Sequence, residues 1–458
     1  MPHTHASALT RSRAQLVASL LLASLGVAAL GAGVAGAATF KPTAAPGFTL
    51  TKLAAAPKGA TNCDDLALLD GHLFMGCQNG VLSNGKGGPP DPKSDTSTLV
   101  EYTTGGKLVK TWAIPNKIDG VGADPLHHRV IVTLDEDANS RLVTVDPSAP
   151  TAQQVVNYTY SPDPRGTSTA AALRTGGGTD SVTVDSTGHL LLTGSHAGTT
   201  TGTATFKVVL TPPSSAGGTG TAALSPTFLD NATATNGTTG SGSVKLALGD
   251  VDSGAIVPPS SPKYAGDYVI DDQTALQLVF AHDLNAGTGL TVLKTAFGLD
   301  DIRWATAPGG TLYIVDKGSQ TPLGISSLYK LTGAFVKGAA YAANDGVSDQ
   351  VVSVNLTNGK VTPVVKGLGT SKGLVYADPS GALPSLPLSV PVSGTPSASA
   401  TSSTSSSAPS SGSATASAKK KSGGSSNTGT IIGIVVVVLL ILGAGGYVLS
   451  RRRGTNPR

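Results

Sequence analysis

A short unit that reads strand, tight turn, strand recurs along most of this 458-residue chain, and it constrains the fold more than any other feature. Its clearest copy, DDIRWATAPGGTLYIVDKGSQTPLGISSLYKL, runs from 300 to 331. Side chains alternate over 302–306 as they do in a pleated strand. Gly309-Gly310 supplies the positive φ angles of a hairpin turn, and 311–315 has a strand composition. One small sheet cannot bury both of its faces, so we expect the copies to stack.

Four further copies are expected at 63–112, 119–158, 180–210 and 244–294, and the clear copy is extended by strands up to 365. Residues 211–243 are rich in Gly, Ser, Thr and Ala, which indicates a long polar loop or insertion. A lone strand at 374–377 has no partner after it, and a strand at 48–53 has none before it. Pairing these two strands within one sheet closes a ring and removes both open edges.

The composition favours an all-β body. The chain contains 58 Gly and 29 Pro, and its only glutamates are Glu101 and Glu136. Glu favours helices, whereas Gly and Pro mark turns. Nine of the 32 Lys and Arg residues lie in the two terminal segments, which hold no acids, so the central body is mildly acidic. This excludes the basic surface that nucleic-acid binding needs.

The two ends of the chain predict its location. Arg11 and Arg13 precede an apolar stretch with a small-residue cleavage pattern at 35–37, as in a secretory signal peptide. The alternative is an uncleaved N-terminal anchor. Near the other end, 431–449 is a run of 19 uncharged residues, long enough for one transmembrane helix, and three arginines follow it on the predicted cytoplasmic side. Attachment to a cell wall is the alternative there, although an LPxTG motif is absent.

The sequence therefore predicts a single-pass plasma-membrane protein with an extracellular body. A stretch that is almost purely Ser, Thr, Ala, Pro, Gly and Lys separates body and helix, and it is predicted to be a disordered stalk. The expected segments are a signal peptide at 1–37, the body at 38–384, the stalk at 385–428, the transmembrane helix at 429–450 and a cytoplasmic tail at 451–458.

Cys63 and Cys77 are the only cysteines, and we expect a disulfide between them because the body is predicted to be exported. A three-residue turn centred on Asp70 would place the two directly opposite each other in a hairpin, within disulfide range. Two free thiols are the alternative.

Four aspartates stand where inner strands of the ring begin, and those ends converge on a central channel. A ring of carboxylates there could bind Ca²⁺, whereas the simpler interpretation is that each Asp caps the preceding turn. Three histidines recur on second strands, far apart in separate sheets, so we expect no zinc site. No nucleotide-binding, G-x-S-x-G or H-E-x-x-H motif is present. The aspartates are Asp65, Asp119, Asp180 and Asp301, and the histidines are His72, His128 and His189.

The pieces DGVGADP…RVIVTLD, DSVTVDSTGHLLLTGS and DDIRWATAPGGTLYIVD resemble the repeats of six-bladed β-propellers of the NHL and gluconolactonase-like type. The resemblance covers about 45–382 and implies six blades, with five or seven left open by the irregular spacing. Gluconolactonase-like enzymes use a glutamate beside Asn and Asp at a metal. Neither Glu101 nor Glu136 is expected at the start of an inner strand, so that chemistry is not carried over.

The expected function is therefore that of a cell-surface binding module for an unknown extracellular ligand or protein, rather than an enzyme. The alternative is a calcium-dependent, lactonase-like hydrolase that uses the channel aspartates.

Overall fold

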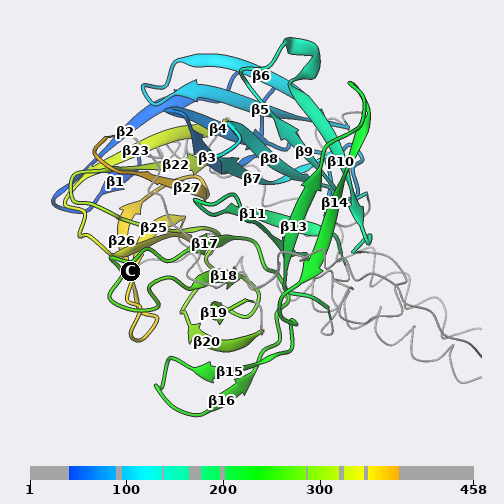
Figure 1. Ribbon diagram of the computed structural model, residues 1–458. Coiled ribbons are helices and arrows are strands. Elements are labelled where there is room, and N and C mark those ends of the chain that lie inside the picture. The colour runs from blue at the N-terminus through cyan, green and yellow to red at the C-terminus, as the bar shows by residue number, and fades with distance from the viewer. Residues whose placement is uncertain are drawn as a thin grey trace, which may run out of the picture. The chain divides into compact units, whose positions relative to one another are not determined.

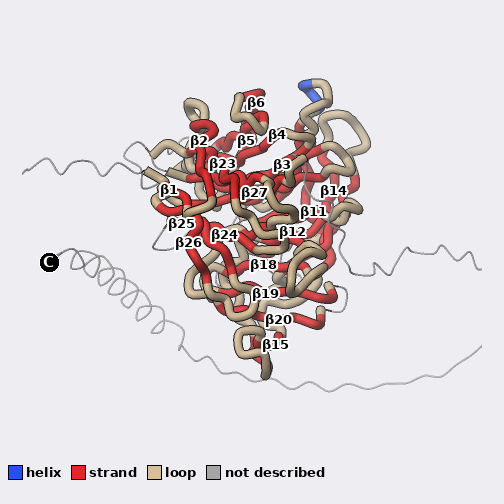
Figure 2. Tube along the Cα trace, turned by 90° about the vertical axis from the view of Figure 1, so that its left-hand side faces the viewer, coloured by secondary structure: helices blue, strands red, loops and turns tan. Residues whose placement is uncertain are grey.

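The computed structural model describes residues 41–88, 95–136, 139–164, 177–195, 202–284, 287–318, 324–344 and 349–380. These residues form 27 strands and one short 3-10 helix, η1 (Thr151–Gln153), so the all-β prediction is confirmed for them. Figure 2 shows strands throughout this part of the chain, with η1 as the helical turn. The strands make six blades, each a small, mostly antiparallel sheet whose inner strand faces a central channel (Figure 1).

The blades have the following strands, from the channel outward. Blade 1 contains β3 (Cys63–Leu69), β4 (His72–Cys77), β5 (Thr96–Thr103) and β6 (Leu108–Pro115). Blade 2 contains β7 (Ile118–Asp124), β8 (Arg129–Leu134), β9 (Arg141–Val145) and β10 (Val155–Ser161). Blade 3 contains β11 (Thr179–Val184), β12 (Leu190–Gly194), β13 (Thr205–Thr211) and β14 (Thr219–Pro226).

Blade 4 contains β17 (Gly254–Ile256), β18 (Tyr268–Asp272), β19 (Gln277–Asp283) and β20 (Thr288–Lys294), and its outer edge adds β15 (Thr233–Asn236) and β16 (Ser243–Lys245). Blade 5 contains β21 (Ile302–Trp304), β24 (Ala340–Asn344), β25 (Gln350–Val354), β26 (Val361–Lys366) and β1 (Thr43–Ala44). Blade 6 contains β27 (Ser371–Ala377), β22 (Thr311–Asp316), β23 (Ser327–Gly333) and β2 (Phe48–Ala55).

The inner strands close a ring, because they contact one another in the order β3, β7, β11, β17, β21, β27 and β3 again. The core lies between the blades. On β3, Leu66 and Leu68 pack toward blade 6, whereas Ala67 and Leu69 pack toward blade 2. An inner strand therefore buries both of its faces, which explains why its sequence is an unbroken apolar run rather than an alternating one. The fold is a six-bladed β-propeller, as the sequence predicts.

The N-terminal strand completes the ring. β2 pairs antiparallel with β23 in the sheet that also contains β27, which confirms the predicted closure. The ring of Phe48 packs 5.1 Å from that of Phe335, centroid to centroid. The two residues of β1 extend the closure, because they pair with β26 in blade 5. One N-terminal segment therefore ties two blades.

The clearest sequence unit, 300–331, is not one blade, and this part of the prediction is wrong. β21 pairs with β24 in blade 5, whereas β22 pairs with β27 in blade 6, so no hairpin joins β21 to β22. Gly310 has a different role from the one expected. A Cβ there would lie 2.4 Å from the carbonyl oxygen of Ala377, so the glycine permits a close approach of β27.

The prediction of a polar loop at 211–243 is also wrong, because this stretch contains β14, β15 and the first residue of β16. Ala222 and Leu224 are buried on β14, and small exposed residues alternate with them. The strand is held on both sides, by β13 and by a parallel pairing with β10 that joins blades 2 and 3 into one sheet. This pairing compensates for a weak apolar pattern.

The Cys63–Cys77 disulfide is present, as predicted, but the register argument for it is only half right. The turn has two residues, Asp70 and Gly71, so Leu69 pairs with His72. A β-bulge between Cys63 and Leu66 then shifts the register by one residue and brings the cysteines opposite each other.

The predicted signal peptide, stalk, transmembrane helix and cytoplasmic tail lie outside the described residues. Residues 38–40 and 381–384 of the predicted body lie outside them too. Among the residues that are described, no helix has the length and hydropathy needed to cross a membrane.

Candidate functional site

The channel has two compartments at opposite ends of the inner strands. Where these strands begin, a chamber of about 220 Å³ is lined by charged side chains, and we call it the acidic chamber. Where they end, a cavity of about 690 Å³ is lined mainly by apolar residues from all six inner strands and the turns after them, and we call it the apolar cavity. The carboxylates of the acidic chamber are Asp64, Asp65, Asp119, Glu136, Asp180, Asp250 and Asp252.

The start of each inner strand follows one pattern, two polar or glycine positions and then an apolar residue. In β3, β7 and β11 these two positions fall in a β-bulge, which turns them out of the ladder. The six pairs, in blade order, are Asp64-Asp65, Asp119-Gly120, Asp180-Ser181, Ser253-Gly254, Asp300-Asp301 and Lys372-Gly373.

Acids at the second position tie neighbouring blades together. Asp65 accepts a hydrogen bond from the main-chain N–H of Val121, 3.0 Å away in blade 2. Asp301 accepts one from the N–H of Leu374, 2.6 Å away in blade 6. Both carboxylates therefore satisfy backbone donors at a blade junction, which is a structural role.

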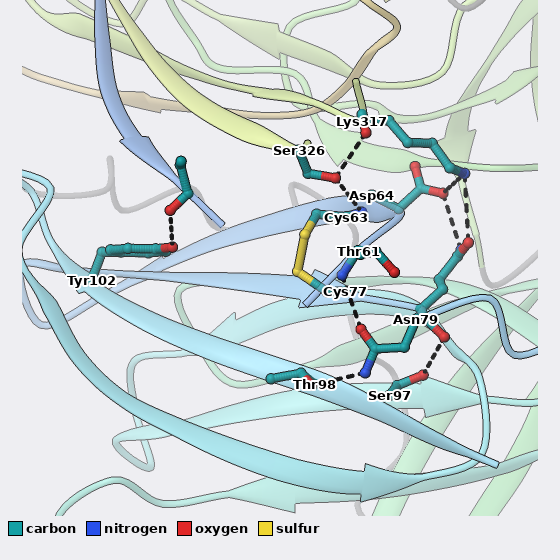
Figure 3. Close-up of a disulfide and its surroundings, with 12 residues drawn as sticks. Thr61, Cys63, Asp64, Cys77, Asn79, Ser97, Thr98, Tyr102, Lys317 and Ser326 are labelled. Carbon is teal, nitrogen blue, oxygen red and sulfur yellow. Dashed lines mark hydrogen bonds and ion pairs between the residues drawn. A yellow bond between two sulfur atoms is a disulfide. The ribbon is translucent and has the colours of Figure 1, made fainter. Parts of the chain in front are cut away.

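Most acids at the first position are paired with lysines. The Asp64 carboxylate lies 2.9 Å from the Lys317 ammonium, beside the disulfide at the start of β3 (Figure 3). Lys372 contacts both Asp300 and Asp64. The two lysines outweigh burial and hold the pKa of Asp64 well below its usual range.

On the other side of the chamber, Lys117 lies 2.6 Å from Asp119 and 2.7 Å from Glu136. The side chain of Glu136 thus reaches the acidic chamber, and the expectation that neither glutamate would lie at an inner-strand end is wrong for this residue. Glu136 follows β8, a second strand, and antiparallel pairing brings that end of β8 back to the start of β7. The sequence pattern for inner strands could not find it.

Asp180 differs from the other acids of the chamber. It is only 5% exposed, and no described residue donates a hydrogen bond to its carboxylate or forms an ion pair with it. Burial raises the pKa of Asp180 well above its usual range, and the charges of Glu136 and Asp252 raise it further. Burial and these two charges therefore favour the neutral form of Asp180, and a cation or hydrogen-bond donor in the chamber would favour the charged form.

The predicted aspartates do not form one equivalent set. Asp65, Asp119 and Asp180 line the acidic chamber, whereas Asp301 pairs with Arg303 at 2.6 Å behind it. The sequence pattern predicted Asp65 at the start of β3, whereas Asp64 is the residue that occupies the same position as Asp119 and Asp180. Within the described ranges, no three His, Cys, Asp or Glu side chains are grouped so that they could hold a metal ion. The lysines of the chamber were not anticipated either.

The three recurring histidines each pair with a carboxylate away from the acidic chamber, and two of these carboxylates, Asp70 and Asp185, line the apolar cavity. His72 contacts Glu101, His128 lies 2.9 Å from Asp70, and His189 lies 2.8 Å from Asp185. Each is at least two-fifths exposed. Their repetition reflects a shared position in the blade.

The apolar cavity combines a hydrophobic wall with a few polar groups. Trp304 and Tyr376 line it, and Leu126 stands at its rim with 55% of its surface exposed. The Trp304 indole N–H and the Thr306 hydroxyl are buried and have no hydrogen-bond partner among the described residues. A buried polar atom without a partner is costly, but both atoms have almost no accessible surface, so neither is open to the cavity. Nothing in the sequence singled out this cavity, because each blade contributes only a few of its residues.

Comparison with known proteins gives structural likeness only. No protein-family model matches the chain, and no curated protein sequence matches it. Similar solved structures include a nidogen/laminin complex (9% identity, TM-score 0.37, covering 69% of this chain and 85% of that chain). They also include the periplasmic gluconolactonase PpgL of Pseudomonas aeruginosa (14% identity, TM-score 0.37, covering 70% of this chain and 88% of that chain). A third is the WD40 β-propeller domain of Doa1 (10% identity, TM-score 0.32, covering 72% of this chain and 96% of that chain). The strand topology, and not these likenesses, carries the assignment of the fold.

Proposed function

We propose that this protein is a cell-surface, membrane-anchored β-propeller that binds a ligand or partner group in its apolar cavity. The observation that carries the proposal is one cavity of about 690 Å³ to which all six inner strands contribute. Its volume lies within the roughly 300–1,000 Å³ of small-molecule sites, which are mostly apolar with a few polar groups. Its mainly apolar wall favours a largely apolar group.

The surface location rests on the sequence alone. A signal-like start, a Ser/Thr-rich stalk and an apolar 19-residue run with arginines after it support export of the body and a single anchor. A binding module held on a stalk presents its channel to the surroundings, and the absence of known catalytic motifs in the sequence fits this role.

The test is a titration of the full chain with N-phenyl-1-naphthylamine, an uncharged dye that fluoresces in apolar sites. Thr306→Phe places a ring in the rim of the cavity, and we expect it to weaken dye binding at least tenfold. Thr111→Phe adds the same ring to the exposed outer strand β6, away from the channel, and should leave the affinity unchanged. Equal affinities in the two variants would contradict the proposal.

A calcium-dependent hydrolase remains the second candidate, and Asp180 is the observation in its favour. Asp180 is a buried carboxylate on which the charges of Glu136 and Asp252 act, and carboxylate oxygens suit a hard cation, but no three such side chains in the described ranges are grouped to hold one. Elemental analysis of the purified chain decides between the two. One Ca²⁺ per chain that is lost in Asp180→Asn would favour the hydrolase, and chain that takes up no Ca²⁺ would reject it.

A further inference from the structure

The chain leaves the propeller at the mouth of the apolar cavity. After β27, the described chain ends at Ser380, and Ser380 itself lines the cavity. The next residues of the sequence therefore start at its rim. Extended chain advances about 3.1 Å per residue in a polyproline II helix, so three or four residues suffice to cross a cavity of this volume.

Residues 383–392, LPSLPLSVPV, differ from the rest of the predicted stalk. They carry three prolines, three leucines and two valines, with no charge, whereas 393–428 contains no Leu, Ile, Val or aromatic residue. Pro384-Ser-Leu-Pro387 is a P-x-x-P sequence, typical of polyproline II. With three residues per turn, Pro384, Pro387 and Val390 share one face, and Leu383 and Leu386 share the next.

The apolar cavity complements such a segment. Proline-rich polyproline II segments bind grooves lined by aromatic side chains, and Trp304 and Tyr376 both line this cavity. The exposed side chain of Leu126 offers apolar surface at the rim.

We propose that the segment 383–392 docks at the apolar cavity of its own chain, with three or four of its residues inside, and competes there with the ligand. This inference rests on the function proposed above for the cavity and adds its regulation. Because the segment begins three residues after the rim, its effective concentration is on the order of 1 mM. A segment with an intrinsic Kd of about 100 µM would then weaken the apparent affinity of any competing ligand roughly tenfold.

The first experiment compares dye affinities in the full chain. The variant Leu386→Ser/Leu388→Ser/Val390→Ser removes the apolar side chains of the segment, and we expect it to bind N-phenyl-1-naphthylamine at least fivefold more tightly than the unaltered chain. The control, Ala414→Ser/Ala416→Ser/Ala418→Ser, makes three changes farther along the stalk and should bind as the unaltered chain does. A synthetic 383–392 peptide at millimolar concentration should reverse the gain.

Equal dye affinity in the unaltered chain and the Leu/Leu/Val variant would overturn the docking but leave the cavity as a binding site. No binding to either chain would contradict the proposed function instead.

The second experiment measures proximity and does not depend on dye binding. Because the native cysteines are joined to each other, Leu126→Cys with Leu388→Cys introduces the only free thiols. We expect oxidation to link them at least ten times faster than Leu126→Cys with Ala408→Cys. Equal rates would mean that the segment does not occupy the cavity.

Discussion

The electrostatics of the acidic chamber predict opposite effects for two aspartates at equivalent positions, Asp180 and Asp64. The pKa of Asp180 is raised in the folded protein. The stability that protonated Asp180 contributes to the fold is therefore fully present below the unfolded pKa of about 4, and it is lost as pH rises through the folded pKa. Asp180→Asn keeps a neutral side chain at every pH. We expect it to match the unaltered protein at pH 4 and to be more stable at pH 8.

The sign of the gain follows from the raised pKa, and each unit by which the folded pKa exceeds the unfolded one contributes about 1.4 kcal/mol. Asp64 has the opposite sign, because its lowered pKa adds stability above the unfolded pKa that is lost as pH falls through the folded one. Asp64→Asn leaves Lys317 without its partner in a site where Asp64 is 17% exposed. We expect a loss of about 2 kcal/mol at pH 8, below the 3–5 kcal/mol of fully buried pairs.

The assay is urea unfolding of the full chain with EGTA present, followed by tryptophan fluorescence at pH 4 and pH 8. The Asp64→Asn variant controls for the loss of a carboxylate as such. A gain for Asp180→Asn of equal size at both pH values would mean that packing, not charge, is responsible. No gain at either pH would refute the account of Asp180 as an unpaired buried acid.

Three further predictions concern topology, the disulfide and inner-strand packing. Protease treatment of intact cells should release a soluble fragment that ends within 385–428, and cleavage confined to broken cells would contradict an external body. Replacing Cys63 and Cys77 by serine should cost about 3 kcal/mol, measured by urea unfolding, because the disulfide closes a 14-residue separation. Gly120→Ala should cost about 1–3 kcal/mol, since its Cβ would lie 2.4 Å from a carbonyl oxygen of β11. Gly105→Ala should be nearly neutral, because its Cβ would make only an ordinary contact, 3.6 Å from the Thr103 hydroxyl oxygen. Equal stabilities of the two variants would contradict this packing.

The sequence predicted the blades whose strands follow each other along the chain, because turn residues and apolar runs are local signals. Blade 1 is the clearest case. Its four strands correspond to the predicted copy at 63–112, although the turn at Asp70-Gly71 has two residues and not the three that were expected. Closure by the N-terminal strand was also predictable, since the strand at 48–53 and the strand at 374–377 each lacked a partner.

The pairing of β21 and β22 with different blades could not be read from the sequence. Gly309-Gly310 is a strong hairpin signal, yet close contact with β27 decides the conformation at Gly310. Such a contact joins residues more than sixty positions apart and leaves no local pattern.

At the site, the sequence identified the correct end of the inner strands but not the correct register. Asp64-Asp65 offers two acids at the start of β3, and their orientations depend on a bulge that only the paired strand β4 defines. The pairing of the chamber's acids with lysines was missed for a related reason, since Lys317 and Glu136 follow the second strands β22 and β8. The apolar cavity was missed because no blade holds more than a few of its residues.

Closure of the ring by β2 is the central claim, since the channel and both compartments exist only in a closed propeller. β2 pairs with β23 at seven positions, and its Phe48 and Leu50 side chains pack against the core. At about 1 kcal/mol per hydrogen bond and roughly 1 kcal/mol per half-buried side chain, its loss should cost 5 kcal/mol or more. That is comparable with the whole stability of many domains, about 5–15 kcal/mol.

The most direct measurement is urea unfolding of the body, 38–384, compared with the same body lacking residues 38–56. A shorter deletion, 38–45, removes only β1 with its two paired residues and serves as the control, with an expected loss of about 1–2 kcal/mol. Closure predicts that the longer deletion lowers the midpoint of the entire transition and abolishes dye binding in the cavity. Equal midpoints for the body with and without 38–56 would contradict the closed propeller.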